Sequence, residues 1–387
     1  MTLGVGVIGC GMVSHAYLST IVRSPDLTLK ALASRTMISA LRQAALYGGE
    51  AMSVEALLAD PDIAIVVNLA PPAVHHALGR RILAAGKHLY SEKPFATRLE
   101  DAYDLIALAE AKGLSIACAP DTFLGAPHQA TRRLVDSGRI GRITGGAMAF
   151  ATRGMESWHP DPAFFYAQGG GPLLDVGPYY LTQLVNLLGP VAEVVAIGAA
   201  PQASRTVTTP GREGQVIAVE VPTTVCGALL FASGTNISLA MSWDVQAHGR
   251  RPIELYGDEG SIQAPDPNQF TGAPRVWLDG DWTPREVEPA PKLSETAIAA
   301  FVQKLVAGVD PFTGEPVGPE TLARLGDWRG LGLLDLAAAI REGREPRCGA
   351  RLAVHVLEVL LALQSSATGG GRIRIQSTVE RPEPVAA

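Results

Sequence analysis

The chain has 387 residues, of which 47% are hydrophobic and 18% charged, so it can bury a large core, and its length indicates two domains. The formal net charge of −6 comes from 32 basic and 38 acidic residues spread along the chain, which provides no basic stripe for nucleic acid or for an anionic membrane. The four cysteines are widely separated and indicate neither a zinc site nor a disulfide framework.

Residues 1–122 alternate between apolar strand patterns and helical spacing. The strand patterns are at 3–8, 27–33, 63–69, 87–90 and 115–118, and helical patterns at 12–23, 37–47, 73–85 and 98–112 lie between them. This alternation predicts an α/β domain with a doubly wound parallel sheet, the Rossmann arrangement that binds dinucleotides.

Residues 123–376 have longer strand patterns, at 143–152, 191–199, 215–221, 224–232 and 235–243. The last three are close enough in sequence to be antiparallel neighbours, which predicts an α+β second domain with an open, largely antiparallel sheet for substrate binding and oligomerisation. Helical patterns follow at 295–308, 332–341 and 351–364, and a short strand at 372–375. We expect a surface loop at 201–214 and a disordered tail at 377–387.

A glycine-rich turn follows the first strand. Gly9 permits a tight turn, and Gly11 lets the backbone of Cys10, Met12 and Val13 approach a pyrophosphate that the next helix can hold with its N-terminal N–H groups. Ser14 stands where a third glycine is more usual, but a serine is small enough for helix and strand to pack. The alternative is an ordinary turn between a parallel strand and a helix.

The end of the second strand indicates which dinucleotide would bind. An NAD enzyme normally places an Asp or Glu there for the ribose 2′-hydroxyl, whereas this chain has Ser34, Arg35 and Thr36. A guanidinium flanked by two hydroxyls suits a 2′-phosphate, which favours NADP. If Arg35 only stacks on the adenine, NAD is acceptable too.

Four motifs occur in order along the chain. They are the turn from Gly9 to Ser14, Ala70-Pro71-Pro72 with His75, the run from Ala85 to Glu92-Lys93-Pro94, and the run from Gly169 to Tyr179. In this order they resemble the glucose-fructose oxidoreductase, inositol dehydrogenase and MocA family of sugar dehydrogenases over nearly the full length. The resemblance implies that Ala70, Pro71, His75 and Glu92 contact the cofactor, although helix packing for His75 and a solvent-facing strand end for Glu92 are alternatives.

The resemblance also implies a catalytic set of Lys93, Asp175 and Tyr179, in which Lys93 reaches both the nicotinamide ribose and the substrate hydroxyl. It places substrate and nicotinamide contacts at Asp121 and Phe123. Tyr179 departs from the commoner pattern, which has a histidine there; the glucose-fructose and dihydrodiol branches also have tyrosine. A free tyrosine has a pKa near ~10 against ~6.5 for histidine, so proton exchange by Tyr179 would need the positive charge of Lys93 nearby.

Asp175 and Tyr179 are four residues apart in a helix expected to begin near Pro172, which would put both on one face, with Asp175 accepting a hydrogen bond from a sugar hydroxyl. A dipole-stabilised carboxylate and a half-buried aromatic ring are the alternative roles. Trp158 and His159 bring an aromatic face and an imidazole suited to a polyol ring, although a lone histidine is more often structural.

These residues predict an NADP-preferring oxidoreductase that moves a hydride between nicotinamide and a secondary or anomeric hydroxyl of a sugar, polyol or cyclic diol, with no metal. A redox-neutral enzyme with a tightly held cofactor and a non-catalytic NADP sensor are alternatives. The strand pattern begins at residue 3, before any room for a leader, and no stretch reaches the ~18 apolar residues of a membrane span, so we expect a cytoplasmic enzyme. We expect it to be a homodimer or homotetramer whose contacts use a broad sheet face.

Overall fold

The computed structural model describes residues 2–159, 161–278, 280, 285–286 and 329–385, and the backbone alone at 285–286. The chain forms two compact units, Met1–Asp121 with Leu293–Val354, and Thr122–Lys292 with His355–Ala387. The first unit therefore takes in a C-terminal segment that the sequence patterns placed in the second domain. The helix predicted at 295–308 lies outside the described residues.

The first unit has a six-stranded, wholly parallel sheet in the order β3-β2-β1-β4-β5-β6. Its strands are β1 (Leu3–Ile8), β2 (Leu27–Ala33), β3 (Glu50–Ala51), β4 (Ile65–Asn68), β5 (His88–Ser91) and β6 (Ile116–Cys118). The predicted doubly wound parallel sheet is confirmed. The short strand β3 was not predicted, because its sequence has no apolar run. The strand order changes direction at β1 and β4, where such sheets bind ligands beyond the carboxyl ends of their strands.

Helices cover this sheet, and β1 is buried from Gly4 to Ile8 because apolar side chains pack against both of its faces. The helices are α1 (Ser14–Arg23), α2 (Met37–Tyr47), α3 (Val54–Ala59), α4 (His75–Ala84), α5 (Leu99–Lys112) and α12 (Leu331–Glu342), with a 3₁₀ turn η1 (Pro72–Val74) before α4. α5 has two acidic residues, Glu100 and Asp101, in its first turn and is capped by Gly113 in the left-handed region; both features are favourable at helix termini.

The second unit has a nine-stranded sheet in the order β16-β15-β14-β13-β7-β12-β11-β8-β17. The strands are β7 (Ile143–Ala151), β8 (Val191–Ala199), β11 (Thr224–Phe231), β12 (Asn236–Ser242), β13 (Ile253–Gly257), β14 (Gly260–Ala264), β15 (Arg275–Leu278), β16 (Arg285–Glu286) and β17 (Ile373–Arg374). Only the β12–β7 pairing is parallel in this sheet, so the predicted largely antiparallel sheet is confirmed.

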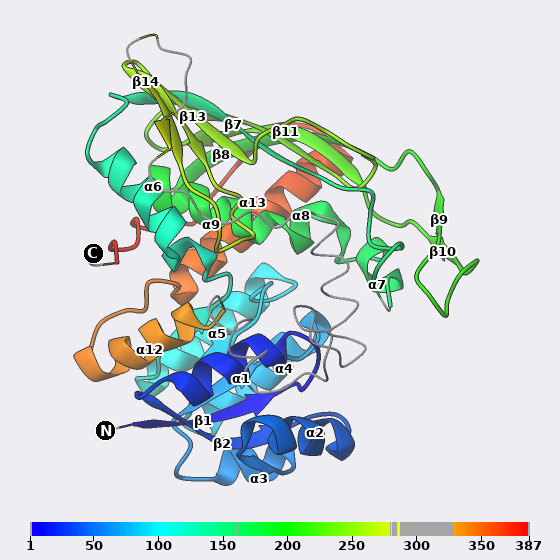
Figure 1. Cartoon of the computed structure of the whole chain (residues 1–387), viewed down its shortest axis with the longest axis vertical. Helices are drawn as coiled ribbons and strands as arrows, with labels where there is room; N and C mark the ends of the chain where they lie inside the picture. The colour runs from blue at the N-terminus through cyan, green and yellow to red at the C-terminus, as the bar shows by residue number, and fades with distance from the viewer. Residues whose placement is uncertain (1, 160, 279, 281–284, 287–328, 386–387) are drawn as a thin grey trace. The chain divides into compact units, whose positions relative to one another are not determined.

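The segment predicted as a loop at 201–214 contributes a strand, β9 (Ser204–Thr206), which pairs with β10 (Val216–Ala218) in a separate antiparallel hairpin beside α7 (Figure 1). The pattern at 215–221 thus forms β10 outside the main sheet. Only three residues of each strand pair, and buried Val207 and Ile217 anchor the hairpin in a cluster with Met155, Tyr166 and Trp243. The local sequence has no alternation long enough to predict such a short strand.

Helices of the second unit are α6 (Ala126–Asp136), α7 (Ala163–Tyr166), α8 (Gly171–Asp175), α9 (Gly177–Leu188) and α13 (Ala350–Gly369), and a 3₁₀ turn η2 (Thr122–Leu124) precedes α6. α13 crosses the division between the units after Val354. This helix was predicted at 351–364; by length and hydropathy it could span a membrane, but 61% of its most apolar window is buried inside the protein. Such burial is typical of a core helix.

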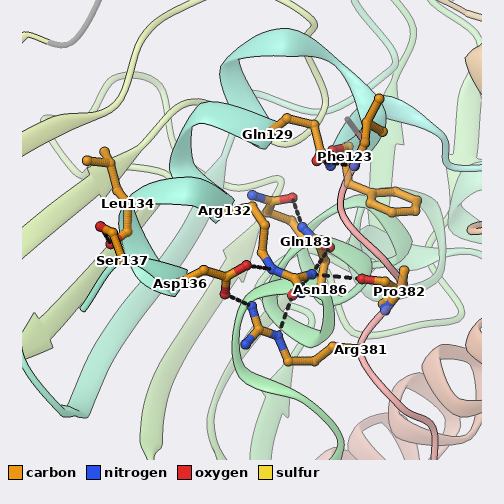
Figure 2. A network of polar contacts seen from close by, with 11 residues as sticks. Phe123, Gln129, Arg132, Leu134, Asp136, Ser137, Gln183, Asn186, Arg381 and Pro382 are labelled. Atoms are coloured by element: carbon orange, nitrogen blue, oxygen red, sulfur yellow. Dashed lines mark hydrogen bonds and ion pairs between the residues drawn. The ribbon is translucent and has the colours of Figure 1, made fainter. Parts of the chain in front are cut away.

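The C-terminal segment differs from the expected disordered tail, because it is held along α6 and α9 (Figure 2). The buried Arg132 donates to the carbonyl oxygens of Asn186 and Pro382, at 2.9 Å each. Arg381 donates to Asn186 at 3.0 Å and pairs with Asp136, and the Val385 amide donates to Gln129 at 2.9 Å. The buried guanidinium of Arg132 needs hydrogen-bond acceptors, and the Pro382 carbonyl of the tail is one of them. The polar, proline-rich sequence of the tail does not reveal this contact.

Candidate active site

The glycine-rich turn has the geometry that backbone recognition of a phosphate requires. Gly9 has φ +107°, and a Cβ there would lie 2.6 Å from the Leu69 carbonyl group, so no other residue fits without moving the backbone. Gly11 is exposed, and a Cβ at this position would meet no atom within 4 Å. Ser14 is buried and donates to the Gly11 carbonyl at 2.6 Å, so it closes the turn where a third glycine was expected. Cys10, Met12 and Val13 lie between these positions.

At the end of β2, Arg35 and Thr36 are exposed, and Ser34 is half-buried. The Thr36 hydroxyl lies 2.8 Å from the hydroxyl of Ser39, while the Arg35 guanidinium has no ion pair with the described residues. Cys10 donates weakly to the Ala33 carbonyl at 3.5 Å, and burial raises its pKa to about 11 even though a hydrogen bond with Ser34 opposes the shift. Cys10 is therefore a neutral packing residue that links the turn to the end of β2.

His75 ties two loops of the predicted cofactor site together. Its Nδ1 lies 2.7 Å from the Pro94 carbonyl oxygen and its Nε2 lies 2.7 Å from the Ala70 carbonyl oxygen, and the ring is buried. With both nitrogens occupied by protein carbonyls, His75 holds the Ala70–Pro71 turn against the Glu92-Lys93-Pro94 segment. These contacts give His75 a positioning role, and a contact of His75 with the cofactor stays a prediction. Buried Asn68 assists, because its Oδ1 accepts from the Ala70 amide at 3.2 Å.

Glu92 is equally occupied by protein groups. Its Oε1 accepts from the Tyr17 hydroxyl at 2.8 Å and its Oε2 accepts from the Lys93 amide at 2.9 Å, with only 8% of the residue exposed. The solvent-facing alternative for Glu92 is thus excluded. Tyr17 lies on α1, directly behind the glycine-rich turn, so one carboxylate connects that helix to the backbone of the half-buried Lys93. Sequence reasoning missed Tyr17 and Asn68, because neither lies in a recognisable motif.

Asp121 and Phe123, the predicted contacts at the domain boundary, are both almost fully buried. Asp121 Oδ2 accepts from the amides of Gly330 and Gly332 at 2.8 and 3.0 Å, and from Tyr90 at 3.3 Å. Burial raises the pKa of Asp121, while the two amides act in the opposite direction. This carboxylate caps the N-terminus of α12. The Phe123 carbonyl accepts from Gln129 at 2.8 Å, so substrate contact by either residue stays a prediction.

The second unit places Asp175 and Tyr179 on two consecutive helices. α8 ends at Asp175, and Val176, with φ −106° and ψ −27°, separates it from α9, so the single helix expected from Pro172 onward is wrong. Gly177 lies at the break, packed against α13: a Cβ there would lie 2.4 Å from Cδ2 of Leu360, so a larger residue would require that side chain to move. Asp175 is half-buried and Tyr179 is 5% exposed. Two residues of the predicted catalytic set are thus fixed at one helix junction.

The charge of the Asp175 carboxylate acts to raise the pKa of the His159 imidazole. Burial outweighs this effect and lowers the pKa of His159, so the ring is neutral at neutral pH. Its Nδ1 accepts from the Asp161 amide at 3.0 Å, which puts the proton on Nε2. Trp158 packs edge-on against this imidazole at 5.3 Å between ring centroids. The structure therefore brings the rings of Trp158 and His159 into contact in the second unit, whereas substrate binding by either residue stays a prediction.

Lys93 belongs to the first unit, and Asp175 and Tyr179 to the second, so their convergence stays a prediction. Each unit taken alone has the features of a recognised half of a nicotinamide enzyme. The first has the glycine-rich turn at the end of β1 of a 3-2-1-4-5-6 sheet, and the second has Asp175 and Tyr179 at the junction of two helices. This fold and these sites define a two-domain oxidoreductase with an NAD(P)-binding Rossmann domain.

Comparison with known proteins agrees with this assignment to a class of oxidoreductases. Residues 3–119 match the model of the oxidoreductase family with an NAD-binding Rossmann fold, and residues 128–263 match the GFO/IDH/MocA C-terminal domain. The chain belongs to the Gfo/Idh/MocA oxidoreductase family.

Among its relatives is dTDP-3,4-didehydro-2,6-dideoxy-alpha-D-glucose 3-reductase of Streptomyces violaceoruber, 28% identical over 92% of this chain and 97% of the relative. The enzyme of the same name from Streptomyces antibioticus is 30% identical over 67% of this chain and 74% of the relative. A solved structure of levoglucosan dehydrogenase in complex with NADH and L-sorbose has a TM-score of 0.75 at 21% identity, covering 97% of this chain and 99% of the other. At that identity the last likeness supports the fold alone.

Proposed function

We propose that the protein is an NADP-preferring oxidoreductase that transfers a hydride between nicotinamide and a secondary or anomeric hydroxyl of a sugar, polyol or cyclic diol, or the matching carbonyl. The observation that carries this proposal is the fixed backbone of Lys93 at the carboxyl edge of the Rossmann sheet, together with Asp175 and Tyr179 at one helix junction. Two relatives are named as reductases of a dTDP-linked didehydro sugar, and these names support a sugar substrate.

The residues present fit a dinucleotide. The Gly9–Gly11 turn leaves its backbone open where a side chain would otherwise stand, and α1 directs its N-terminal amides toward that turn. The exposed Arg35 guanidinium and Thr36 hydroxyl supply the donors that a 2′-phosphate prefers, which supports NADP over NAD. When bound, the nicotinamide supplies the hydride acceptor or donor.

The chain's own residues manage the substrate and its proton. In oxidation, the Tyr179 oxygen takes the proton of the reacting hydroxyl; in reduction, it donates a proton to the carbonyl oxygen. Lys93 provides positive charge at that oxygen, where negative charge develops, and Glu92 keeps the Lys93 backbone in place. Asp175 accepts a hydrogen bond from a neighbouring hydroxyl and so orients the ring.

The test is a panel of sugars, keto sugars and polyols assayed with NADP and NAD by nicotinamide absorbance. Lys93→Ala should abolish turnover while the protein stays folded and still binds NADPH, as measured by quenching of protein fluorescence. A Lys112→Ala variant is the matched control, because Lys112 lies at the far end of α5 and donates only to the Ala84 carbonyl in the described structure. Unchanged turnover in Lys93→Ala would refute the catalytic assignment.

We further propose that the protein is a cytoplasmic homodimer or homotetramer that associates through the open face of the second sheet. Ile197 and Val195 on β8 are 79% and 41% exposed, and Cys226 of β11 is paired with Ile197 and exposed too. Two such apolar side chains on one flat sheet face favour association. Ile197→Asp should shift the mass measured by light scattering to that of the monomer, whereas Thr144→Asp on a distant exposed position should not.

A further inference from the structure

The C-terminal tail, residues 376–385, is bound by buried polar groups of the second unit. It leaves β17 and first meets Glu358 of α13, whose carboxylate accepts from the amides of Gln376 and Ser377 at 2.7 and 2.8 Å. Glu358 is only 8% exposed. A buried carboxylate that accepts from two consecutive amides fixes the direction in which the tail leaves the sheet.

Further along, the tail lies against one face of α6. Three side chains of this helix contact three residues of the tail. They are Gln129, Arg132 and Asp136, which meet Val385, Pro382 and Arg381 in that order. Side chains three and four positions apart lie on the same side of a helix, so all three contacts are made by one face of α6. The tail therefore runs antiparallel to α6 in a single register; the last two contacts are drawn in Figure 2.

Two guanidinium groups clamp the tail between α6 and α9. Arg132 of α6 and Arg381 of the tail both donate to the Asn186 carbonyl oxygen, at 2.9 and 3.0 Å, in the last turn of α9. Carbonyl groups in the last turn of a helix lack intrahelical partners, and positive charge is favourable there. The side chain of Arg132 is 7% exposed and also donates to the Pro382 carbonyl oxygen at 2.9 Å. Removal of the tail would leave a buried cation with one acceptor fewer, so the tail stays docked.

Gln129 links the docked tail to the turn that carries Phe123. The residue is 3% exposed, and both ends of its amide group are hydrogen-bonded. Oε1 accepts from the Val385 amide at 2.9 Å, and Nε2 donates to the Phe123 carbonyl oxygen at 2.8 Å. The turn η2 is a single 3₁₀ turn of three residues, whose hydrogen-bond geometry is poorer than that of an α-helix, so it depends on such outside contacts. Without the tail, Oε1 loses its donor, and the amide group is no longer held in the orientation that binds the Phe123 carbonyl.

We propose that Gln129 is a positioning residue of the substrate site and that the docked tail sets it: the Val385 amide orients Gln129, and Gln129 holds η2 so that Phe123 contacts the substrate. Neither Gln129 nor the tail needs to touch the substrate, because both act through the backbone of η2. Displacement of a binding surface weakens substrate binding without changing the proton-transfer groups, so the effect belongs to KM and not to kcat. This inference rests on the proposed function and on substrate contact by Phe123.

The first measurement needs no substrate. Val385→Pro removes the N–H group that Gln129 accepts from and leaves Arg381 and Pro382 unchanged. Hydrogen–deuterium exchange, followed by mass spectrometry on peptides that cover residues 121–129, should become about three- to tenfold faster than in wild type, the factor that one neutral hydrogen bond contributes. Glu380→Pro is the matched control, because it makes the same change at an exposed tail position whose amide has no hydrogen bond to the described residues; it should leave this exchange unchanged.

The second measurement is steady-state kinetics with a sugar or polyol that the wild-type enzyme uses. In Val385→Pro, KM for this substrate should rise about three- to tenfold, while kcat and KM for NADP change less than about twofold. Gln129→Met keeps the length of the side chain but lacks both hydrogen bonds, and it should show the same rise in KM. Because both changes break one relay, the double variant should have the KM of the single variants and not the product of their effects. Gln129→Met also keeps the test open if Val385→Pro does not fold.

The outcomes are distinguishable. If the wild type oxidises or reduces no sugar or polyol of the panel, the proposed function fails, and the role in substrate binding fails with it. If the wild type is active but Val385→Pro and Gln129→Met keep its exchange rates at 121–129, the tail does not set η2 and the inference is refuted. If exchange becomes faster while KM stays that of Glu380→Pro, the contact only stabilises the fold, and Gln129 is not a positioning residue; the proposed function stands in both of these cases.

Discussion

Replacing Tyr17 with phenylalanine tests whether Glu92 positions Lys93. The substitution removes one hydroxyl from a ring that is fully buried and packed edge-on against Tyr90 at 5.5 Å, so it creates almost no cavity. What is lost is a 2.8 Å hydrogen bond to a carboxylate that is itself 8% exposed. Hydrogen bonds to charged groups contribute about 1.5–3 kcal/mol, so we expect the free energy of unfolding to fall by about 2 kcal/mol.

The functional effect should exceed what stability alone would cause. With Oε1 unpaired, the Glu92 carboxylate can rotate away from the Lys93 amide that it now holds at 2.9 Å. A displacement of Lys93 by a fraction of an ångström should lower kcat by about tenfold at a temperature where the variant is fully folded. Urea unfolding followed by circular dichroism measures the first effect, and steady-state kinetics measures the second.

Tyr90→Phe is the matched control. Tyr90 is as deeply buried as Tyr17, but its hydroxyl lies 3.3 Å from Asp121, whose Oδ2 keeps two amide donors after the change. We expect a loss of about 0.5–1 kcal/mol and normal kcat. Equal losses of stability in both variants, or normal kcat in Tyr17→Phe, would show that Glu92 does not depend on Tyr17.

Three further predictions concern cofactor choice, proton transfer and pH. Arg35→Ala should raise KM for NADP about 10- to 100-fold and leave KM for NAD unchanged, as steady-state assays with both cofactors would show; equal effects would mean that Arg35 only stacks on the adenine. Tyr179→Phe should lower kcat by about 10²- to 10⁴-fold with a smaller change in KM, and a normal kcat would exclude its role in proton exchange. Burial lowers the pKa of His128 from 6.5 to about 4, so the stability contributed by its neutral form is complete above pH 6.5 and is lost as the pH falls towards 4, by roughly 3 kcal/mol. In His128→Gln the melting temperature should therefore fall less than in wild type between pH 7 and 4. An equal fall in both proteins would mean that other groups cause the loss of stability at acid pH.

The first domain could be predicted from sequence because each of its elements follows a local rule. Apolar runs of four to seven residues, separated by helical spacing, specify parallel strands and crossover helices without reference to distant residues. The tight turn at Gly9 could be predicted in the same way. The structure shows why glycine stands there: φ is positive and Leu69 approaches closely, so no other residue fits. Motifs of this kind also identified Lys93, Asp175 and Tyr179 as the candidate site.

Tertiary structure alone decided what holds these residues. At the break between α8 and α9, Gly177 lies against Leu360 of α13, and no pattern near Asp175 encodes that contact. Strand β9 lies where composition indicated a loop, and its Arg205 finds ion-pair partners at Glu156 and Asp244, each roughly forty to fifty positions away. Local sequence determines which backbone conformations are low in free energy. The pairing of buried polar groups depends on which distant segments meet, and this is why Tyr17, Asn68 and Gln129 became visible only in the folded chain.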